Sequence, residues 1–483
     1  MAQSHERPQV DRKARLQIPA QKIPKQDPNV RILNWSEVYL PLDIETAKVE
    51  AERCIQCPAA PCQVACPVGN DIPRALWELE HGDPLQAADI FHETSNMPEM
   101  CGRLCPQERL CEGDCVVGKK AKPVAIGRLE AFVADWKRKH GEPARIANRS
   151  GKRVAVVGAG PAGLSVAEDL AKLGHAVTVF DNWPAIGGVL RYGIPDFKLE
   201  KQVIDEKIET LAELPIEFVM NTRIAADGDR GIDALFDDGY DAIFLGHGAS
   251  CGNELDIEGA NLAGIHQATE FLSRGNLAPS ELPESMREPL HAGRRVVIIG
   301  GGDTSMDCSR TAVRLGAREV TLVYRRTEKE MIGREEERQH AREEGVRFEF
   351  LAAPVRLLGT PAGRVRAVQL VRMELGPPDE SGRRRPQPVP GSEFTLEADT
   401  VVLAIGYNAD DAVAASARGL ATDKWGLVII DRETGQTNRP GIYAGGDDVN
   451  GADLVVTALR DARVAARAMH EYLSRRMPAT AAS

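Results

Sequence analysis

The sequence lacks the features that membrane, secreted and nucleic-acid-binding proteins require. Its longest apolar runs are strand-sized, at Val154–Val157, Val296–Ile299 and Thr400–Ile405, whereas a membrane-spanning helix needs roughly 20 apolar residues. The arginine-rich N-terminal stretch has no apolar core and does not predict a signal peptide. Basic residues number 60 against 71 acidic ones, a net charge of −11, which is poorly suited to neutralising nucleic-acid phosphates. We therefore expect a cytoplasmic protein that binds neither membranes nor nucleic acid.

Cysteine is scarce outside one short segment, because eight of the ten cysteines lie between Cys54 and Cys115. The two runs read Cys54-x2-Cys57-x4-Cys62-x3-Cys66-Pro67 and Cys101-x3-Cys105-Pro106-x4-Cys111-x3-Cys115. Disulfides are disfavoured in a reducing compartment, and the two well-separated knuckles of a typical zinc site are absent. Four closely spaced thiolates that end in Cys-Pro resemble the bacterial ferredoxin run. The runs predict iron–sulfur clusters, with structural zinc as the alternative.

The 483 residues allow about three globular units at roughly 150 residues each. Residues 1–35 are polar and proline-rich, and we expect an extended arm that does not fold alone. Residues 36–140 combine the cysteine runs with helical patterns, which predicts a small helical iron–sulfur domain. The predicted helices are Ile72–Glu80, Pro84–Thr94 and Ile126–Lys139. Residues 476–483 form a small-residue, flexible tail.

Short segments rich in β-branched residues then alternate with Ala- and Leu-rich helical segments. This βαβ pattern indicates parallel sheets. It occurs twice, opening at Arg153–Val157 and at Arg295–Ile299. We predict a discontinuous FAD-binding domain over residues 141–291 and 407–475, with an NADPH-binding domain inserted at 292–406. A turn-rich insertion is expected at Ser381–Ser392.

The first unit carries a dinucleotide-binding turn between its first strand and the next helix. The turn residues are Gly158, Gly160, Pro161, Ala162 and Gly163. Glycines at this spacing permit a tight turn and close approach of a pyrophosphate, which the helix N-terminus attracts. Asp181 ends the next strand, Ala176–Phe180, where an acid can hold ribose hydroxyls. A tight turn without a ligand is the alternative.

Two further segments resemble the FAD motifs of flavin-dependent NADPH oxidoreductases. Gly187–Pro195 resembles the segment beside the isoalloxazine ring, and Gly441–Asp447 resembles the second FAD motif, whose aspartate binds the ribityl chain. The resemblance implies FAD contacts at Gly187, Gly188, Leu190, Lys198, Gly446 and Asp447. The next helix is predicted to begin near Ala452, and backbone N–H groups around its residues Val456 and Thr457 suit negative charge on the reduced ring.

The second unit has a glycine-rich turn that departs from the fingerprint. Its residues Gly300, Gly302, Asp303 and Thr304 are candidate NADPH contacts, and Ser305 replaces the third glycine. The next strand, Val320–Val323, is followed by Arg325 and Arg326 where an NAD site would carry an acid. Arginines there accept a 2′-phosphate and favour NADPH, the alternative being two surface arginines. Ala404 and Gly406 close another strand near the expected nicotinamide.

Across the chain, this order of motifs resembles the small (β) subunits of NADPH-dependent glutamate synthase. The cysteine domain also resembles the N-terminal module of dihydropyrimidine dehydrogenase. These resemblances imply two [4Fe–4S] clusters with crossed ligation. One would be held by Cys54, Cys57, Cys62 and Cys115, and the other by Cys66, Cys105, Cys111 and an eighth ligand, Glu130 or Cys101.

The implied fold is α/β, with two Rossmann-like domains in the glutathione-reductase-like arrangement after the helical domain. No Cys-x-x-Cys pair lies near the flavin segment, so a disulfide reductase is not expected. The family role is electron input, from NADPH through FAD and the clusters to a large subunit that carries FMN and makes L-glutamate from glutamine and 2-oxoglutarate. We assign no catalytic acid or base, since hydride transfer depends on positioning.

Three alternatives share these parts or the fold. They are an NADPH:ferredoxin oxidoreductase or transhydrogenase subunit, the flavin subunit of a dihydropyrimidine dehydrogenase, and a non-redox binding module.

Overall fold

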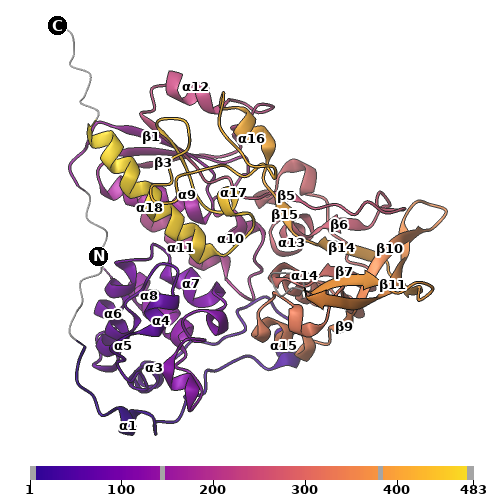
Figure 1. The fold of residues 1–483 in the computed structure, drawn as a ribbon, viewed down its shortest axis with the longest axis horizontal. Helices are drawn as coiled ribbons and strands as arrows, with labels where there is room; N and C mark the ends of the chain where they lie inside the picture. Colours follow the sequence, from indigo (N-terminus) through magenta and orange to yellow (C-terminus); the bar gives the residue numbers. More distant parts are fainter. Residues whose placement is uncertain (1–6, 142–146, 379–383, 476–483) are drawn as a thin grey trace.

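The computed structural model describes residues 7–141, 147–378 and 384–475. The predicted tail at 476–483 and the first six residues of the predicted arm lie outside this described part. Figure 1 shows a helical domain at the lower left, a first parallel sheet above it, and a second sheet to the right.

The helical domain contains six α-helices within residues 44–140. They are α3 (Ile44–Glu52), α4 (Pro61–Ala65), α5 (Ile72–Glu80), α6 (Pro84–His92), α7 (Pro98–Leu104) and α8 (Ile126–His140). Asp71 and Asp83 cap α5 and α6, and each helix has a proline in its first turn. Leu76, Phe91 and Leu129 are fully buried between the helices. The helices predicted near these positions are confirmed, with end shifts of at most two residues in α6 and one in α8.

The first sheet is parallel, in the order β16-β4-β1-β2-β3. Its strands are β1 (Arg153–Val157), β2 (Ala176–Phe180), β3 (Ile216–Val219), β4 (Ala242–Leu245) and β16 (Ile442–Ala444). Alternate residues of β1 point to opposite faces. Val154 and Val156 share a core with α9 (Pro161–Lys172) and α18 (Val455–Arg475), while Ala155 and Val157 pack on the other face.

The second sheet is also parallel and has the order β6-β14-β7-β8-β9. Its strands are β6 (Ile265–Gln267), β7 (Arg295–Gly300), β8 (Glu319–Tyr324), β9 (Arg347–Phe350) and β14 (Thr400–Ala404). The helices α13 (Ala268–Asn276) and α14 (Asp303–Arg314) pack together beside it. Because β6 pairs with β14, this sheet includes residues before the predicted boundary at 292.

An antiparallel sheet extends the second unit. It consists of β10 (Ala352–Gly359), β11 (Val365–Pro378), β12 (Arg384–Pro388) and β13 (Phe394–Glu397). The turn-rich prediction for Ser381–Ser392 is wrong for Arg384–Pro388, which forms β12 on the far half of β11. The prolines of β12 are compatible with this edge position, where fewer ladder hydrogen bonds are required.

A two-stranded ribbon connects the two parallel sheets. It pairs β5 (Cys251–Gly252) with β15 (Tyr407–Asn408), so the chain leaves the first unit and returns to it side by side. The α/β architecture with two Rossmann-like units after a helical domain is therefore confirmed.

The N-terminal arm packs against other parts of the molecule. Its described part contains α1 (Arg12–Arg15) and α2 (Pro28–Arg31). The Arg31 side chain is 1% exposed and forms ion pairs with Glu343 and Glu344, at the end of α15 (Glu335–Glu343) and just beyond it. Trp35 stacks on Phe197, which follows the predicted flavin segment. The arm thus gains its order from contacts with other units.

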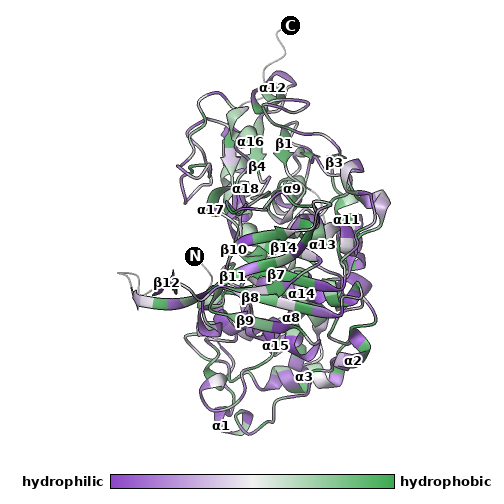
Figure 2. Cartoon of the chain, turned by 90° about the vertical axis from the view of Figure 1, so that its right-hand side faces the viewer, coloured by the Kyte–Doolittle hydropathy of each residue, from purple (hydrophilic) through white to green (hydrophobic). Residues whose placement is uncertain are grey.

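Hydropathy follows these layers. In Figure 2 the central strands of the second sheet are largely hydrophobic, whereas helices on the outside show mixed or polar colouring. Within the described residues, no helix is both long enough and apolar enough to cross a lipid bilayer.

Candidate cofactor sites

The first glycine turn has the tight geometry that a dinucleotide site needs. Gly158 has φ +107°, and a Cβ there would lie 2.3 Å from the carbonyl oxygen of Gly246. A Cβ on Gly163 would lie 1.9 Å from the carbonyl oxygen of Gly158. Neither position admits a side chain, so the backbone remains open at the N-terminus of α9.

The predicted flavin segment packs directly on this turn. The N–H of Gly187 donates to the carbonyl of Ala159 at 3.0 Å. A Cβ on Gly188 would lie 2.6 Å from the Cα of Gly160. The two glycine backbones are therefore in contact, and Leu190, in α10 (Val189–Tyr192), is fully buried behind them.

The third predicted FAD segment reaches the same place from the C-terminal part of the chain. Gly446 has φ +99°, and a Cβ there would lie 3.1 Å from the Cβ of Ala162. Burial raises the pKa of Asp447 to about 6. The helix α18 begins at Val455, and the N–H groups of its first turn lack intrahelical acceptors. The helix begins three residues after its predicted start near Ala452, so Val456 and Thr457 lie in its first turn, and their contact with FAD stays a prediction.

Two other predicted FAD residues have protein partners. Asp181 accepts hydrogen bonds from the N–H groups of Ala159, at 2.7 Å, and Trp183, at 2.9 Å, so it braces the first turn. Lys198 forms a 2.9 Å ion pair with Asp307 of α14 and joins the flavin segment to the second unit. Their direct contact with FAD stays a prediction.

The second glycine turn is also closed to a side chain at its first position. Gly300 has φ +153°, and a Cβ there would lie 2.2 Å from the carbonyl oxygen of Ala404. Ser305, which replaces the third glycine, donates from Oγ to the carbonyl of Gly302 at 2.8 Å. Its hydroxyl thus satisfies a backbone acceptor inside the turn. Asp303 accepts from the N–H of Arg334 at 3.0 Å, so it also braces the turn, and Thr304 is partly buried in the first turn of α14.

The two arginines after β8 differ in environment. Arg325 is exposed, whereas Arg326 is 7% exposed, and its buried Nε has no hydrogen-bond partner. An unpartnered buried guanidinium N–H is costly, and an anionic ligand would supply the missing acceptor. At the end of β14, Gly406 has φ +100°, and a Cβ there would lie 3.1 Å from Nδ2 of Asn253. These residues are compatible with a phosphorylated dinucleotide.

The cysteines form two groups. Cys54, Cys57, Cys62 and Cys115 line one cavity whose other walls are mainly apolar. Burial raises the pKa of Cys54 to about 12, and the nearby Cys115 and Cys57 add to this increase. The four thiols predicted as one ligand set are therefore together.

The second group surrounds both candidates for the eighth ligand. Burial raises the pKa of Cys66 to about 11, with further contributions from Glu130 and Cys101. Glu130 is 5% exposed and accepts from Nδ2 of Asn70 at 3.0 Å, and the adjacent Cys101 raises the pKa of Cys105. Burial raises the pKa of Cys111, and the nearby Glu130 carboxylate adds to this increase. Both candidates adjoin the group, so the choice between them stays a prediction.

Among the described residues, no group of three or more His, Cys, Asp or Glu side chains has the geometry that binds a single metal ion.

Sequence reasoning missed the residues that attach the cysteine domain to the flavin side. Asn96, just before α7, accepts from Oγ of Ser165 at 2.9 Å and from Nη1 of Arg463 at 2.9 Å. Cys101 and Cys105 belong to the same packed core as Ala162 and Leu459. Since these partners are far apart in sequence, no local pattern marks the contact.

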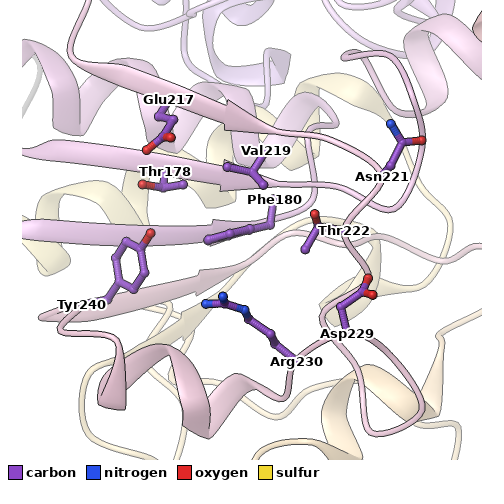
Figure 3. Close-up of a pocket in the computed structure, with 9 residues that line it drawn as sticks. All are labelled: Thr178, Phe180, Glu217, Val219, Asn221, Thr222, Asp229, Arg230 and Tyr240. Carbon is purple, nitrogen blue, oxygen red and sulfur yellow. The ribbon is translucent and has the colours of Figure 1, made fainter.

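A separate cavity of about 410 Å³ has none of the predicted cofactor residues in its lining (Figure 3). It is lined by Thr178, Phe180, Glu217, Val219, Asn221, Thr222, Asp229, Arg230 and Tyr240. Phe180 and Tyr240 belong to the core on the sheet face opposite α9 and α18. The cavity is thus not part of the glycine-turn site.

Two protein families match this chain. Residues 31–142 match dihydropyrimidine dehydrogenase domain II, 4Fe-4S cluster. Residues 152–462 match the pyridine nucleotide-disulphide oxidoreductases. Together the two matches cover the helical domain and both parallel sheets, and they support the iron–sulfur interpretation over zinc.

Relatives extend the likeness over most of the chain. The glutamate synthase [NADPH] small chain of Escherichia coli K12 is 40% identical over 457 residues, which cover 93% of this chain and 96% of that protein. The oxidoreductase AegA of the same organism is 40% identical, over 92% of this chain and 68% of that protein. The structure of FprA from Mycobacterium tuberculosis in complex with NADPH has a TM-score of 0.56 at 22% identity, over 67% of this chain and 84% of that one. This last likeness shows the shared fold.

Proposed function

The chain belongs to the family of NADPH-dependent glutamate synthase small chains, and on that premise we propose that it is the electron-input subunit of a glutamate synthase. In this role it oxidises NADPH and delivers electrons through two [4Fe–4S] clusters to a large subunit. That partner carries FMN and makes L-glutamate from glutamine and 2-oxoglutarate.

One observation carries this proposal. The helix α7 holds Cys101, and Cys105 follows it directly, and both pack in the core formed by α9 and α18 at the proposed FAD site. Cys54 and Cys62 pack in the separate core of the helical domain. This arrangement supports a linear order, in which the group around Cys105 receives electrons first and the group around Cys54 passes them on.

The residues act by binding and positioning. When bound, FAD exchanges a hydride with NADPH and single electrons with iron–sulfur clusters. The proposed FAD site consists of the first glycine turn, the Gly187–Gly188 segment and the start of α18, which meet at Gly160, Gly188 and Gly446. The N-terminus of α18 favours negative charge beside it.

The proposed NADPH site is the second glycine turn with Arg325 and Arg326. The turn leaves backbone N–H groups of α14 free for a phosphate, and the arginines would bind the 2′-phosphate. The chain needs no general acid or base for hydride transfer, because the reaction depends on alignment of two rings.

A second candidate acceptor follows from the comparisons. AegA, an oxidoreductase under another name, is as similar in identity as the glutamate synthase small chain. A chain with the same NADPH, FAD and cluster sites can deliver electrons to a different redox enzyme, and this is the alternative function.

Copurification and reconstitution distinguish the two functions. The tagged chain is isolated from its native cells, and its stoichiometric partner is identified. The complex is then assayed for NADPH oxidation that requires both glutamine and 2-oxoglutarate. We expect glutamate to form in proportion to NADPH consumed. If the complex oxidises NADPH without requiring glutamine and 2-oxoglutarate, the alternative function replaces the glutamate synthase assignment. If the purified chain is colourless and shows no absorbance change with NADPH, the redox function itself is wrong.

A further inference from the structure

The N-terminal arm places one arginine directly behind the first cysteine loop. From α1, Arg12 donates through Nε to the carbonyl of Ile55 at 3.2 Å and through Nη2 to the carbonyl of Gln56 at 3.4 Å. These two carbonyls belong to the loop between Cys54 and Cys57. The guanidinium therefore binds two consecutive peptide units of the loop.

The opposite ends of these peptide units face the cysteines. Hydrogen bonding from the N–H of Gln56 opposes the burial-driven rise in the pKa of Cys54, and hydrogen bonding from the N–H of Cys57 opposes the rise in the pKa of its own thiol. In a trans peptide the C=O and N–H point in opposite directions. Each peptide unit thus has the Arg12 cation at its carbonyl and a cysteine sulfur at its N–H. A hydrogen bond to the carbonyl strengthens the N–H as a donor, since linked hydrogen bonds polarise one another.

The loop is built to hold this orientation. Gln56 is fully buried and has φ +48°, a left-handed conformation that is uncommon for a residue other than glycine. Its side-chain amide donates to the carbonyl of Pro73 at 2.8 Å and lies 3.7 Å from Sγ of Cys54. The sulfur of Cys54 therefore has two donors from one residue.

Arg12 also differs from the other arginines of the arm in its charge balance. Arg7 is paired with Asp71, and Arg15 is paired with Glu80 through two hydrogen bonds. Within the described residues, Arg12 has no carboxylate partner. Its positive charge opposes the burial-driven rise in the pKa of Cys57, which is less buried than the Cys54 thiol at the other end of the loop.

We propose that Arg12 raises the reduction potential of the cluster held by Cys54, Cys57, Cys62 and Cys115, and so makes it the better acceptor of the two. This inference rests on the proposed function and its ligand assignment. Reduction adds one electron, and no bond forms or breaks. The added negative charge on the sulfurs is stabilised by N–H donors and by a nearby cation, both of which raise cluster potentials.

The test is a reductive titration of the purified full-length chain, followed by electron paramagnetic resonance. The variant is Arg12→Gln, which removes the charge, and the control is Lys13→Gln. Lys13 is the exposed neighbour of Arg12 on α1, so the control removes one positive charge from the same helix. Iron content and FAD content are measured for each protein, because a lost cluster and a shifted potential are different results.

We expect Arg12→Gln to move one cluster to a more negative potential and to leave the other cluster and FAD unmoved. At a fixed applied potential, the ratio of reduced to oxidised cluster should fall about threefold to tenfold. This is the range expected when one hydrogen bond is weakened. Because Arg12 is solvent-exposed, the shift should shrink in high salt. Lys13→Gln should produce a smaller shift.

An unchanged potential in a fully loaded Arg12→Gln protein would overturn the inference, as would an equal shift with Lys13→Gln. A shift of the second cluster, the one assigned to Cys66, Cys105 and Cys111, would also overturn it. If Arg12→Gln loses iron, Arg12→Lys retains the charge and should load both clusters with a smaller shift in the same direction. Failure of Arg12→Lys to shift either cluster would also refute the proposal. Absence of cluster signals in the unmodified chain would instead refute the proposed function.

Discussion

Ser165, in the helix that follows the first glycine turn, donates a 2.9 Å hydrogen bond to Asn96 of the cysteine domain. Asn96 is 3% exposed and also donates to Asp169 at 2.8 Å. The backbone carbonyl of Asn96 accepts from Nζ of Lys207 at 2.8 Å. One asparagine thus connects the cysteine domain to several helices of the first sheet, beside the proposed path for electrons.

Asn96→Ala should loosen this junction and slow electron transfer from the flavin to the clusters. Because Ser165, Asp169 and Arg463 each lose a partner, we expect a destabilisation of about 2 kcal/mol. Stopped-flow absorption at the flavin and cluster bands should show normal flavin bleaching by NADPH and slower cluster reduction. Ser165→Ala, which removes one of these bonds, is the milder control. Cluster reduction at the normal rate in Asn96→Ala would exclude this junction from the path.

Replacing both Arg325 and Arg326 by Ala should weaken NADPH use selectively. A guanidinium paired with the 2′-phosphate contributes a charge-assisted hydrogen bond that NADH lacks. We expect the KM for NADPH to rise roughly tenfold to a hundredfold while the KM for NADH stays nearly constant. Arg318→Ala is the matched control, since Arg318 is exposed just before the other end of β8. An equal loss with both coenzymes would sink the assignment.

Cysteine variants should separate flavin reduction from cluster function. Cys54→Ala should lose the cluster of the first group and Cys111→Ala that of the second, since a methyl group cannot replace a thiolate ligand. In both, delivery to the partner subunit should fail while NADPH still reduces a dye that accepts directly from FAD. If a folded, FAD-loaded variant is not reduced by NADPH, the proposed linear order is wrong.

Glu130 and Cys101 compete for the eighth ligand position, and substitutions decide between them. We favour Glu130, although a carboxylate is a harder ligand than a thiolate. Glu130→Ala should make one cluster labile or alter its paramagnetic resonance spectrum, whereas Cys101→Ser should retain about eight irons per chain. Loss of four irons with Cys101→Ser and none with Glu130→Ala would give the position to Cys101.

The sequence by itself determined the local parts of this protein. The glycines of both turns and the cysteine spacings are short-range signals, because each reports a backbone constraint or a ligand set within a few residues. Periodicity predicted three helices of the cysteine domain to within two residues and the strands Arg153–Val157 and Ala176–Phe180. The strand Arg384–Pro388 was missed because its turn-forming composition gave no sign of its pairing with β11.

Only the tertiary structure decided which residues these local segments contact. The contact of Gly446 with Ala162, the attachment of Asn96 to Ser165, and the position of Arg12 behind the Cys54–Cys57 loop all join residues that are distant in sequence. Burial also depends on these distant contacts. Arg326 and Arg31 are charged residues of a type usually found on the surface, yet both are buried. Such contacts depend on how separate units pack, and a local pattern contains no information about the partner that desolvates it.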